Sequence, residues 1–342
     1  MTDTKSAPPT ETDAPATAGT RLSGWRWQHE LERLAVPLAW GVIIVIFSVL
    51  RPDTFWTVGN FATILGSNAV LVVLALGLLL PLRAGDYDLS VAGTLTLSAM
   101  MLGILSGEHH INIVPVIALA VLMGALVGLV NGLFVLIFGI NPFIVTLGMG
   151  TLLLGIVLLI SGDATFSGIS QHLVNVVIVY KLLGIPLEFY YGLVVCLAIW
   201  YLFVYTTLGR KLLFVGTARN VARLSGIGVG KIRLGALVGA GVLAALAGVL
   251  YAGTSGSADP TSGASFLLPA YAAAFLGATT IVPGRFNAWG TVIAAYFLLT
   301  GVTGLAILGL GPWVEDVFYG GALIVAVALS QLARRRTEQE IS

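Results

Sequence analysis

The most restrictive feature of this sequence is a series of uncharged apolar stretches, each about as long as a lipid bilayer is thick. A helix needs roughly 20 apolar residues to cross a membrane. Because backbone groups in lipid must be hydrogen-bonded within the protein, we expect such stretches to be helices. The sequence therefore predicts an all-α polytopic membrane protein with about ten transmembrane helices, at residues 34–50, 61–82, 88–106, 112–138, 142–161, 189–206, 234–254, 266–282, 288–310 and 313–332.

The composition excludes several other classes of protein. Only 10% of the residues are charged and 57% are hydrophobic, whereas soluble domains carry roughly 25% charged residues. A net charge of +1 gives no reason to expect a nucleic-acid partner. With one cysteine, Cys196, and four histidines without ligand spacing, we expect no metal site. The segment GIGVGK at 226–231 departs from the phosphate-binding pattern, so we expect no cofactor on this chain and any ATP to be bound by another chain.

The two termini are more polar than the segments between them. Residues 1–24 are rich in Ala, Pro and Thr and are predicted to be a disordered cytoplasmic tail. Residues 25–34 alternate apolar and charged side chains, which is typical of an interfacial helix on a membrane surface. A transmembrane domain over 35–332 and a cytoplasmic tail over 333–342 complete the predicted organisation.

The distribution of Lys and Arg predicts the orientation. With ten crossings and a cytoplasmic N-terminus, all but two of the 17 Lys and Arg residues lie on the cytoplasmic side. The two exceptions are Arg51 and Lys181. Cytoplasmic segments near membrane helices carry an excess of these residues. The sequence therefore predicts that both termini are cytoplasmic.

The largest predicted cytoplasmic loop, 208–233, has six Lys or Arg residues and no acid. It is too polar to span a membrane. We expect a short helix at 218–225, ended by Gly226, Gly228 and Gly230. Two roles remain open from the residues alone: docking of a partner, or attraction to anionic headgroups, which gains about 1 kcal/mol for each basic residue near the surface.

Three ionisable residues, Arg83, Asp86 and Asp88, interrupt an apolar region. A charge in the middle of a bilayer costs about 2.5–3.5 kcal/mol on insertion scales, so each needs a partner or a function. Arg83 can pair with Asp86 or Asp88 across a turn. Asp88 can accept a backbone N–H at the start of the next helix, and Ser90 adds capping capacity. The alternative is that these groups face a substrate path.

Other polar residues inside the apolar segments are few. Asn131 lies within the fourth predicted span, and Asn141 and Thr146 lie at the start of the fifth. They are candidates for the substrate path, although buried amides commonly bond to neighbouring helices. The spaced glycines Gly124, Gly128 and Gly132, and Gly235 and Gly239, predict close helix packing.

Several motifs in register resemble those of a known family. The segments are DLSVAGTLTLSAM (88–100), NPFIVTLGMGTLLLG (141–155), ARLSGIGVGKIR (222–233), ALAGVLYAG (245–253) and PGRFNAWGTVIAA (283–295). Together they resemble the membrane permease subunit of ribose-type bacterial ABC sugar importers, over about residues 35–332. The resemblance implies a non-enzymatic, multi-pass subunit in the bacterial inner membrane that imports a sugar or related polyol.

The resemblance also implies partners and functional residues. Such permeases work as a dimer with a second copy or a paralogue, with a cytoplasmic ABC ATPase and with a periplasmic or extracellular substrate-binding protein. The Asp-Leu-Ser-Val match implies a role in the substrate path for Asp88, with Ser90, Asp86 and Arg83 around it. The ATPase is expected on the coupling loop at 208–233, through Arg219, Ala222, Arg223, Leu224, Ser225 and Gly226.

The loop departs from the family pattern at one position, because Arg219 stands where the family usually has an acid. We predict a matching change on the cognate ATPase. The alternatives to a sugar importer are a branched-chain amino-acid ABC permease, an ion-coupled secondary carrier and a membrane enzyme. A carrier needs buried ionisable groups in several spans, and an enzyme needs a convergent catalytic set. The sequence shows neither.

Overall fold

The computed structural model describes residues 21–66 and 68–339, with side-chain positions for residues 33–66 and 68–329. The expected disordered tail, 1–24, therefore lies almost wholly outside the described residues. The α-helices are α1 (Arg21–Leu50), α2 (Pro52–Phe55), α3 (Val58–Gly66), α4 (Ala69–Arg83), α5 (Val91–Leu102), α6 (Ile113–Ile137), α7 (Pro142–Ser161), α8 (Gln171–Val174), α9 (Leu187–Tyr205), α10 (Thr207–Thr217), α11 (Arg219–Leu224), α12 (Val229–Ser255), α13 (Ala264–Gly277), α14 (Ala288–Ile307) and α15 (Trp313–Gln339).

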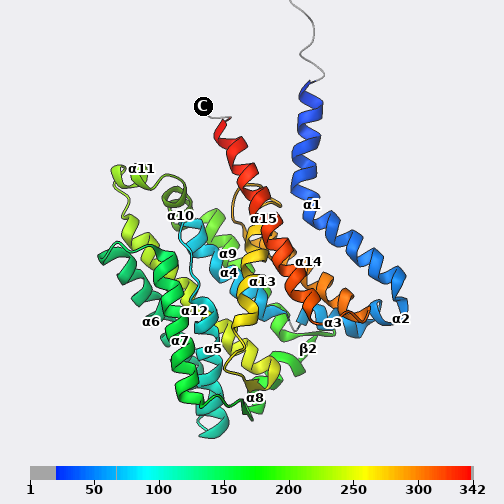
Figure 1. The fold of residues 1–342 in the computed structure, drawn as a ribbon, viewed down its shortest axis with the longest axis vertical. Coiled ribbons are helices and arrows are strands. Elements are labelled where there is room, and N and C mark those ends of the chain that lie inside the picture. The colour runs from blue at the N-terminus through cyan, green and yellow to red at the C-terminus, as the bar shows by residue number, and fades with distance from the viewer. Residues whose placement is uncertain (1–20, 67, 340–342) are drawn as a thin grey trace, which may run out of the picture.

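Short π-helical turns and strands complete the fold. The π-helical turns are η1 (Gly103–Glu108) and η2 (Asn175–Val179). Strand β1 (Phe166–Ser167) pairs antiparallel with β4 (Ser257–Ala258), and β2 (Lys181–Leu182) pairs antiparallel with β3 (Ile185–Pro186). Figure 1 shows the long helices bundled side by side, with the strands confined to connections.

Eight helical segments in the described part of the chain are long and apolar enough to cross a membrane. They correspond to the first seven predicted spans and the ninth. The eighth predicted span is shorter than expected, because α13 contains only 14 residues. At 1.5 Å per residue it reaches roughly 21 Å, less than the roughly 30 Å hydrocarbon thickness. The tenth predicted span lies in α15, which is not among these eight segments. The prediction of ten crossings therefore stays a prediction.

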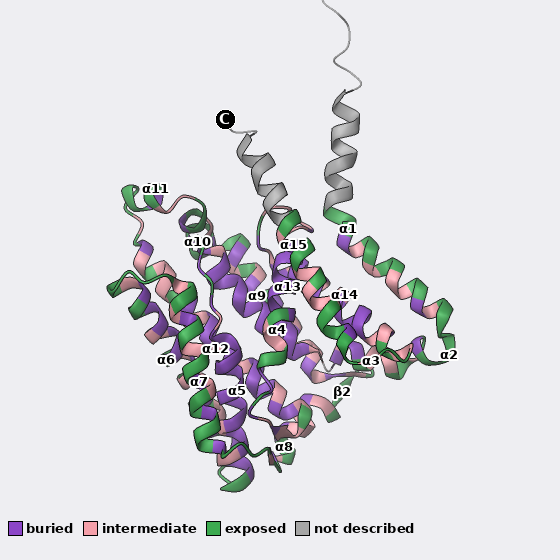
Figure 2. Cartoon of the chain, in the orientation of Figure 1, coloured by how far each residue is buried: buried purple, intermediate pink, exposed green. Residues whose placement is uncertain are grey.

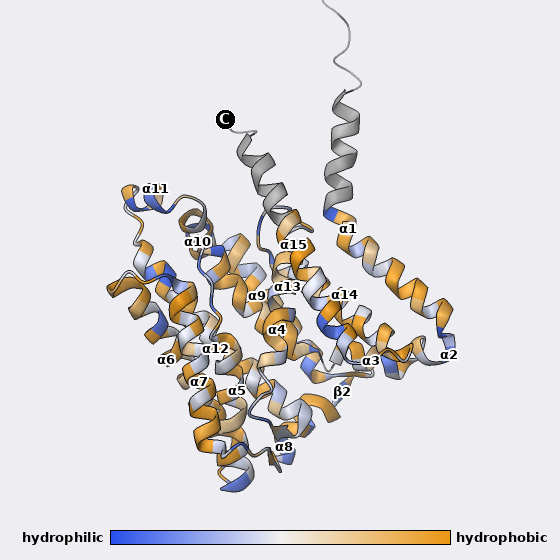
Figure 3. Ribbon diagram, viewed as in Figure 1, coloured by the Kyte–Doolittle hydropathy of each residue, from blue (hydrophilic) through white to orange (hydrophobic). Residues whose placement is uncertain are grey.

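The outer helices expose apolar side chains, as a membrane protein requires. Leu159 on α7 is 82% exposed and Val49 on α1 is 74% exposed. Figure 2 shows exposed residues along α1, α7 and α15, around a buried interior at α4 and α5. Figure 3 shows that these exposed surfaces are apolar and that polar residues gather near α10 and α11. So large an exposed apolar surface is stable only in lipid, and the chain is a multi-pass membrane protein.

Helix α12 lies at the centre of the bundle, in contact with α4, α5 and α6. A side chain on Gly124 or Gly128 of α6 would collide with the backbone carbonyls of Gly241 and Leu237 on α12. The predicted glycine packing is therefore confirmed for α6. On α12 it holds for Gly239, which faces Leu80, whereas Gly235 has no such neighbour in the described structure.

A proline ties the first helix to the rest of the bundle. Pro37 lies inside α1 and has no N–H to bond the carbonyl of Arg33 four residues earlier. That carbonyl instead accepts hydrogen bonds from the Ile281 N–H (3.2 Å) and the Thr280 hydroxyl (2.7 Å). The expected interfacial helix, 25–34, is continuous with the first span in α1, and its position on a membrane surface stays a prediction.

The connections gather at two ends of the bundle. At one end, Asp86 in the turn after α4 contacts Arg219 and Arg233. At the same end, Arg83 contacts the carbonyl of Phe286 and Arg33 contacts Ile281. At the other end, β1 pairs with β4. Figure 1 shows that α1 begins and α15 ends at the same end of the bundle as α11. Segments predicted on the cytoplasmic side thus lie together.

Candidate substrate path and coupling site

A non-helical break over residues 84–90 joins α4 to α5 inside the bundle. Its backbone groups find partners on three other elements or on the turn itself. The Asp88 N–H donates to the Tyr271 hydroxyl (3.1 Å), and the Leu89 N–H donates to the Thr146 hydroxyl (3.0 Å). The Asp86 N–H bonds to the carbonyl of Pro81 (2.9 Å). Such irregular backbone persists at membrane depth only when protein surrounds it.

The break carries a chain of polar side chains that are fully buried. The Ser90 hydroxyl donates to Asp88 Oδ1 (2.6 Å), and the Ser90 N–H donates to the same oxygen (3.0 Å). The Asn131 side-chain amide on α6 donates to Ser90 Oγ (2.8 Å). Asp88 and Asn131 are both 0% exposed. The expected capping is not seen: Asp88 bonds the N–H of Ser90, the residue before α5, and neither Asp88 nor Ser90 makes a side-chain cap hydrogen bond to the first turn of α5.

Two acceptor atoms of this chain remain unused. No described residue donates to Asp88 Oδ2 or to Asn131 Oδ1. A buried acceptor without a donor costs free energy, on the order of 1–3 kcal/mol and more for a charged group. The two oxygens can therefore receive hydrogen bonds from a ligand or water, which keeps Asp88 and Asn131 as candidates for contact with a polar substrate.

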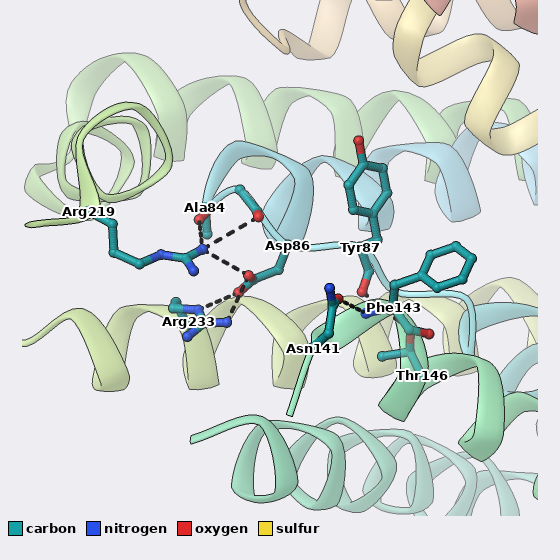
Figure 4. Close-up of polar contacts among 9 residues, drawn as sticks. Ala84, Asp86, Tyr87, Asn141, Phe143, Thr146, Arg219 and Arg233 are labelled. Carbon is teal, nitrogen blue, oxygen red and sulfur yellow. Dashed lines mark hydrogen bonds and ion pairs between the residues drawn. The ribbon is translucent and has the colours of Figure 1, made fainter. Parts of the chain in front are cut away.

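The other two path candidates lie in different positions. Thr146 is buried beside the break, and its hydroxyl donates toward the carbonyls of Pro142 (2.8 Å) and Tyr87 (3.3 Å). Asn141 is exposed and caps α7, since its Oδ1 accepts the Phe143 N–H (2.9 Å). Figure 4 shows both residues below the break. Asn141 is thus a helix cap, and its place in a substrate path stays a prediction.

The expected pairing of Arg83 with Asp86 or Asp88 is wrong. The Arg83 guanidinium donates to the carbonyls of Phe286 (3.3 Å) and Phe203 (3.5 Å) and lies over the Phe203 ring, 4.1 Å from its centre. Its position at the last residue of α4 directs the side chain toward α9 and away from the two acids. Aromatic faces and carbonyls replace the expected carboxylate partner.

Asp86 instead pairs with two arginines from distant segments, and we call Asp86, Arg219 and Arg233 the Asp86 cluster. Arg233 on α12 donates Nε to Oδ2 (2.7 Å) and one terminal nitrogen to Oδ1 (2.9 Å). Arg219 on α11 donates to Oδ1 (3.0 Å). Figure 4 shows the two side chains reaching Asp86 from two helices. A bidentate charged pair of this kind is strong and directional.

The coupling loop forms the expected short helix, which is one residue shorter at each end than predicted (α11), and Gly230, expected to end it, lies instead within α12. The helix is followed by Gly226 with a left-handed φ of +78°. Ala222 is fully buried and packs with Val215 and Val229. Leu224 is 88% exposed and Arg223 is exposed beside it.

Sequence reasoning missed two residues of these sites, Arg233 and Tyr271, and one buried acid elsewhere in the bundle, Glu188. Arg233 looked like one basic residue among six, and Tyr271 looked like an ordinary apolar helix residue. Glu188, at the start of α9, is 0% exposed and accepts a hydrogen bond from the Thr254 hydroxyl (2.5 Å). An acid at the first turn of a membrane helix right after Pro186 was the available signal for it.

Comparison with protein families gives a decisive match over most of the chain. The family described as "Branched-chain amino acid transport system / permease component" matches residues 60–327. This chain belongs to that family of transport permeases. The family is one of permeases and not of enzymes, as the sequence predicted.

This chain aligns with curated relatives over nearly the full length of each relative. The D-allose transport system permease protein AlsC of Escherichia coli K12 is 33% identical over 85% of this chain and 89% of its own. The ribose import permease protein RbsC of the same strain is 32% identical over 91% of this chain and 96% of its own. The autoinducer 2 import system permease protein LsrD of Salmonella paratyphi A is 32% identical over 90% and 92%. No solved structure matches the chain. The resemblance to ribose-type permeases is confirmed.

Proposed function

We propose that this chain is the transmembrane permease subunit of an ABC importer that carries a sugar or a related polyol. The observation that carries the proposal is the set of relatives named for allose, ribose and autoinducer 2 import, each about one-third identical over most of both chains. The fold supports it, because long apolar helices surround a break at 84–90 that carries the buried polar residues Asp86, Asp88 and Ser90.

The buried chain Asp88–Ser90–Asn131 supports recognition of hydroxyl groups. A carboxylate oxygen and an amide carbonyl oxygen each accept hydrogen bonds from hydroxyls, and Asp88 Oδ2 and Asn131 Oδ1 both lack a donor among the described residues. Both residues are sealed from the surface. A substrate reaches them only after the surrounding helices separate, as a path that opens alternately to the two sides requires.

The coupling helix α11 supports a separate ATPase. Leu224 and Arg223 are exposed, and buried Ala222 fixes the helix to α10 and α12 through Val215 and Val229. The proposed ATPase contacts the exposed residues Arg223, Leu224, Ser225 and Gly226 and supplies the ATP site, so the permease itself needs no cofactor. Two residues expected at this contact are placed differently: Ala222 is buried and supports the helix from inside, and Arg219 pairs with Asp86 of the same chain. The matching change on the ATPase, opposite Arg219, stays a prediction.

The proposed orientation places both termini and α11 in the cytoplasm of a bacterium, with the chain in the inner membrane. The excess of Lys and Arg on that side supports it. A substrate-binding protein delivers the cargo from outside, and a second permease copy or a paralogue completes the transport path. The organisation proposed for the chain keeps the interfacial segment at 25–34 and the transmembrane domain at 35–332.

The nearest competing assignment is import of a branched-chain amino acid, which the family description names. Stimulated ATP hydrolysis distinguishes the two. The permease–ATPase complex is incubated with its co-encoded binding protein loaded in turn with ribose, allose and leucine. The proposal predicts stimulation by a sugar-loaded binding protein. Stimulation by the leucine-loaded form alone would contradict it.

A further inference from the structure

The Asp86 cluster joins the coupling helix to the break that carries Asp88. Arg219 is the first residue of α11, Arg233 lies in the second turn of α12, and Asp86 lies two residues before Asp88. The Asp86 side chain is 1% exposed and holds both arginines. One carboxylate therefore links a cytoplasmic helix to the buried polar residues of the bundle (Figure 4).

We propose that Arg219 is a positioning residue whose ion pair with Asp86 opens and closes during transport and so transmits the movement of α11 to Asp88. The proposal rests on the proposed function, because it needs an ATPase that moves α11. It adds a residue-level connection inside the permease itself: the movement passes from α11 to the 84–90 break through a contact that can be released.

The two arginines bind Asp86 unequally, and this makes the Arg219 contact releasable. The Arg233 side chain is 11% exposed and bonds both carboxylate oxygens, at 2.7 and 2.9 Å. The Arg219 side chain is 38% exposed and bonds one oxygen, at 3.0 Å. When Arg219 leaves, both oxygens of Asp86 still have a charged donor. The penalty for an unpaired buried charge is thereby avoided.

The backbone beside the ion pair makes a second contact between the same segments. The Arg219 nitrogen that bonds Asp86 also approaches the carbonyls of Gly85 (3.4 Å) and Ala84 (3.5 Å). Gly216, near the end of α10, lies so close to the Arg83 carbonyl that a side chain there would collide with it. Movement of residues 216–219 therefore displaces the backbone of the break as well as its carboxylate.

The positive charge at position 219 determines whether this contact can form. An acid here would face Asp86 across a short distance in a poorly solvated region, where like charges repel strongly. The structure thus gives Arg219 an acidic partner within the same chain.

The test compares Arg219→Lys, Arg219→Gln and Arg219→Glu in proteoliposomes that contain the permease, its ATPase and its loaded binding protein. The readout is the number of ATP molecules hydrolysed per substrate imported. We expect Arg219→Lys to stay near the wild-type value and Arg219→Gln to raise it about fivefold or more, the lower end of typical coupling between sites. Arg219→Glu should raise it further. Arg210→Gln removes an exposed charge from α10 and should leave the value unchanged.

The order of the variants decides between a charge contact and a simple effect of side-chain size. If Arg219→Gln and Arg219→Glu hydrolysed as many ATP molecules per imported substrate as the wild type, the proposal would be overturned. Loss of the ATPase from purified Arg219→Gln complexes would also overturn it, because Arg219 would then act in docking. If Arg219→Gln fails to insert, equal values for Arg219→Lys and Arg219→Glu would overturn it. Failure of the wild-type complex to import with ATP would instead contradict the proposed function.

Discussion

The side-chain amide of Asn131 on α6 donates a hydrogen bond to the hydroxyl of Ser90, 2.8 Å away, and that hydroxyl donates to Asp88. Ser90 therefore fixes the orientation of the one buried acid in the break that keeps an oxygen without a described donor. The serine acts on Asp88 twice, through its hydroxyl and through its backbone N–H.

Ser90→Ala removes the hydroxyl bond and leaves the backbone bond. Hydrogen bonds to charged groups contribute about 1.5–3 kcal/mol, so we expect initial uptake of the transported sugar to fall roughly tenfold or more. Ser98→Ala is the matched control, since Ser98 is a buried serine on α5, the helix that follows Ser90, and bonds the Ala245 carbonyl instead. Equal uptake in the two variants would show that Ser90 does not orient a transport residue.

Arg233→Ala removes the bidentate partner of Asp86 and leaves that carboxylate with Arg219 alone. Breaking a buried pair by removing one partner costs about 3–5 kcal/mol. We expect a lower thermal unfolding midpoint for the purified permease in detergent, measured by tryptophan fluorescence. Lys231→Ala, an exposed change near the start of α12, should leave the midpoint unaltered. A stable Arg233→Ala protein would argue against the Asp86 cluster as a structural link.

Gly124→Ala tests the contact between α6 and α12. The added methyl group would collide with the Gly241 carbonyl and with Ala245, and overpacking costs about 1–3 kcal/mol. Gly148→Ala on α7 meets no atom within 4 Å and gains helix propensity of about 1 kcal/mol. The two substitutions should therefore shift the unfolding midpoint in opposite directions. A shift in the same direction would contradict the close approach.

Asp259 predicts a dependence on pH in the connection between α12 and α13. Hydrogen bonds from the Thr261 hydroxyl and N–H lower the pKa of its carboxyl below the ordinary 3.8. A lowered pKa means that the charged form stabilises the fold above this range and that the contribution is lost as the pH falls through it. Asp259→Asn should flatten the loss of thermal stability between neutral pH and pH below 3.8. If thermal stability depended on pH in the same way in Asp259→Asn as in the wild type, the charged form of Asp259 would not stabilise the fold.

Much of the fold could be predicted because its signals are local. Apolar length predicted most of the helices, and spaced glycines predicted close packing of α6, for which the structure gives α12 as the partner. Segments predicted on one side of the membrane do lie together, as the contacts of Arg33 with Ile281 and of Asp86 with Arg219 show. The buried polar chain was partly predicted, since Asp88, Ser90 and Asn131 were all candidates.

The partners of the charged residues could not be predicted, because they depend on distant segments. Arg83 and Asp86 are three residues apart, yet one bonds carbonyls of α9 and of the segment before α14 and the other bonds arginines of α11 and α12. Because Arg83 and Asp86 are close in sequence, an ion pair between them was expected. It does not form, because their side chains point toward different helices. The short length of α13 was missed for a related reason, since a buried helix can be as apolar as one that spans the membrane.

The most direct test of the central claim measures sugar uptake into proteoliposomes that contain this permease, with and without its ATPase, ATP and loaded binding protein. We expect uptake only when all components are present, and none with Asp88→Ala assembled at the wild-type level in the same complex. Uptake by the permease alone, or normal uptake by Asp88→Ala, would contradict it.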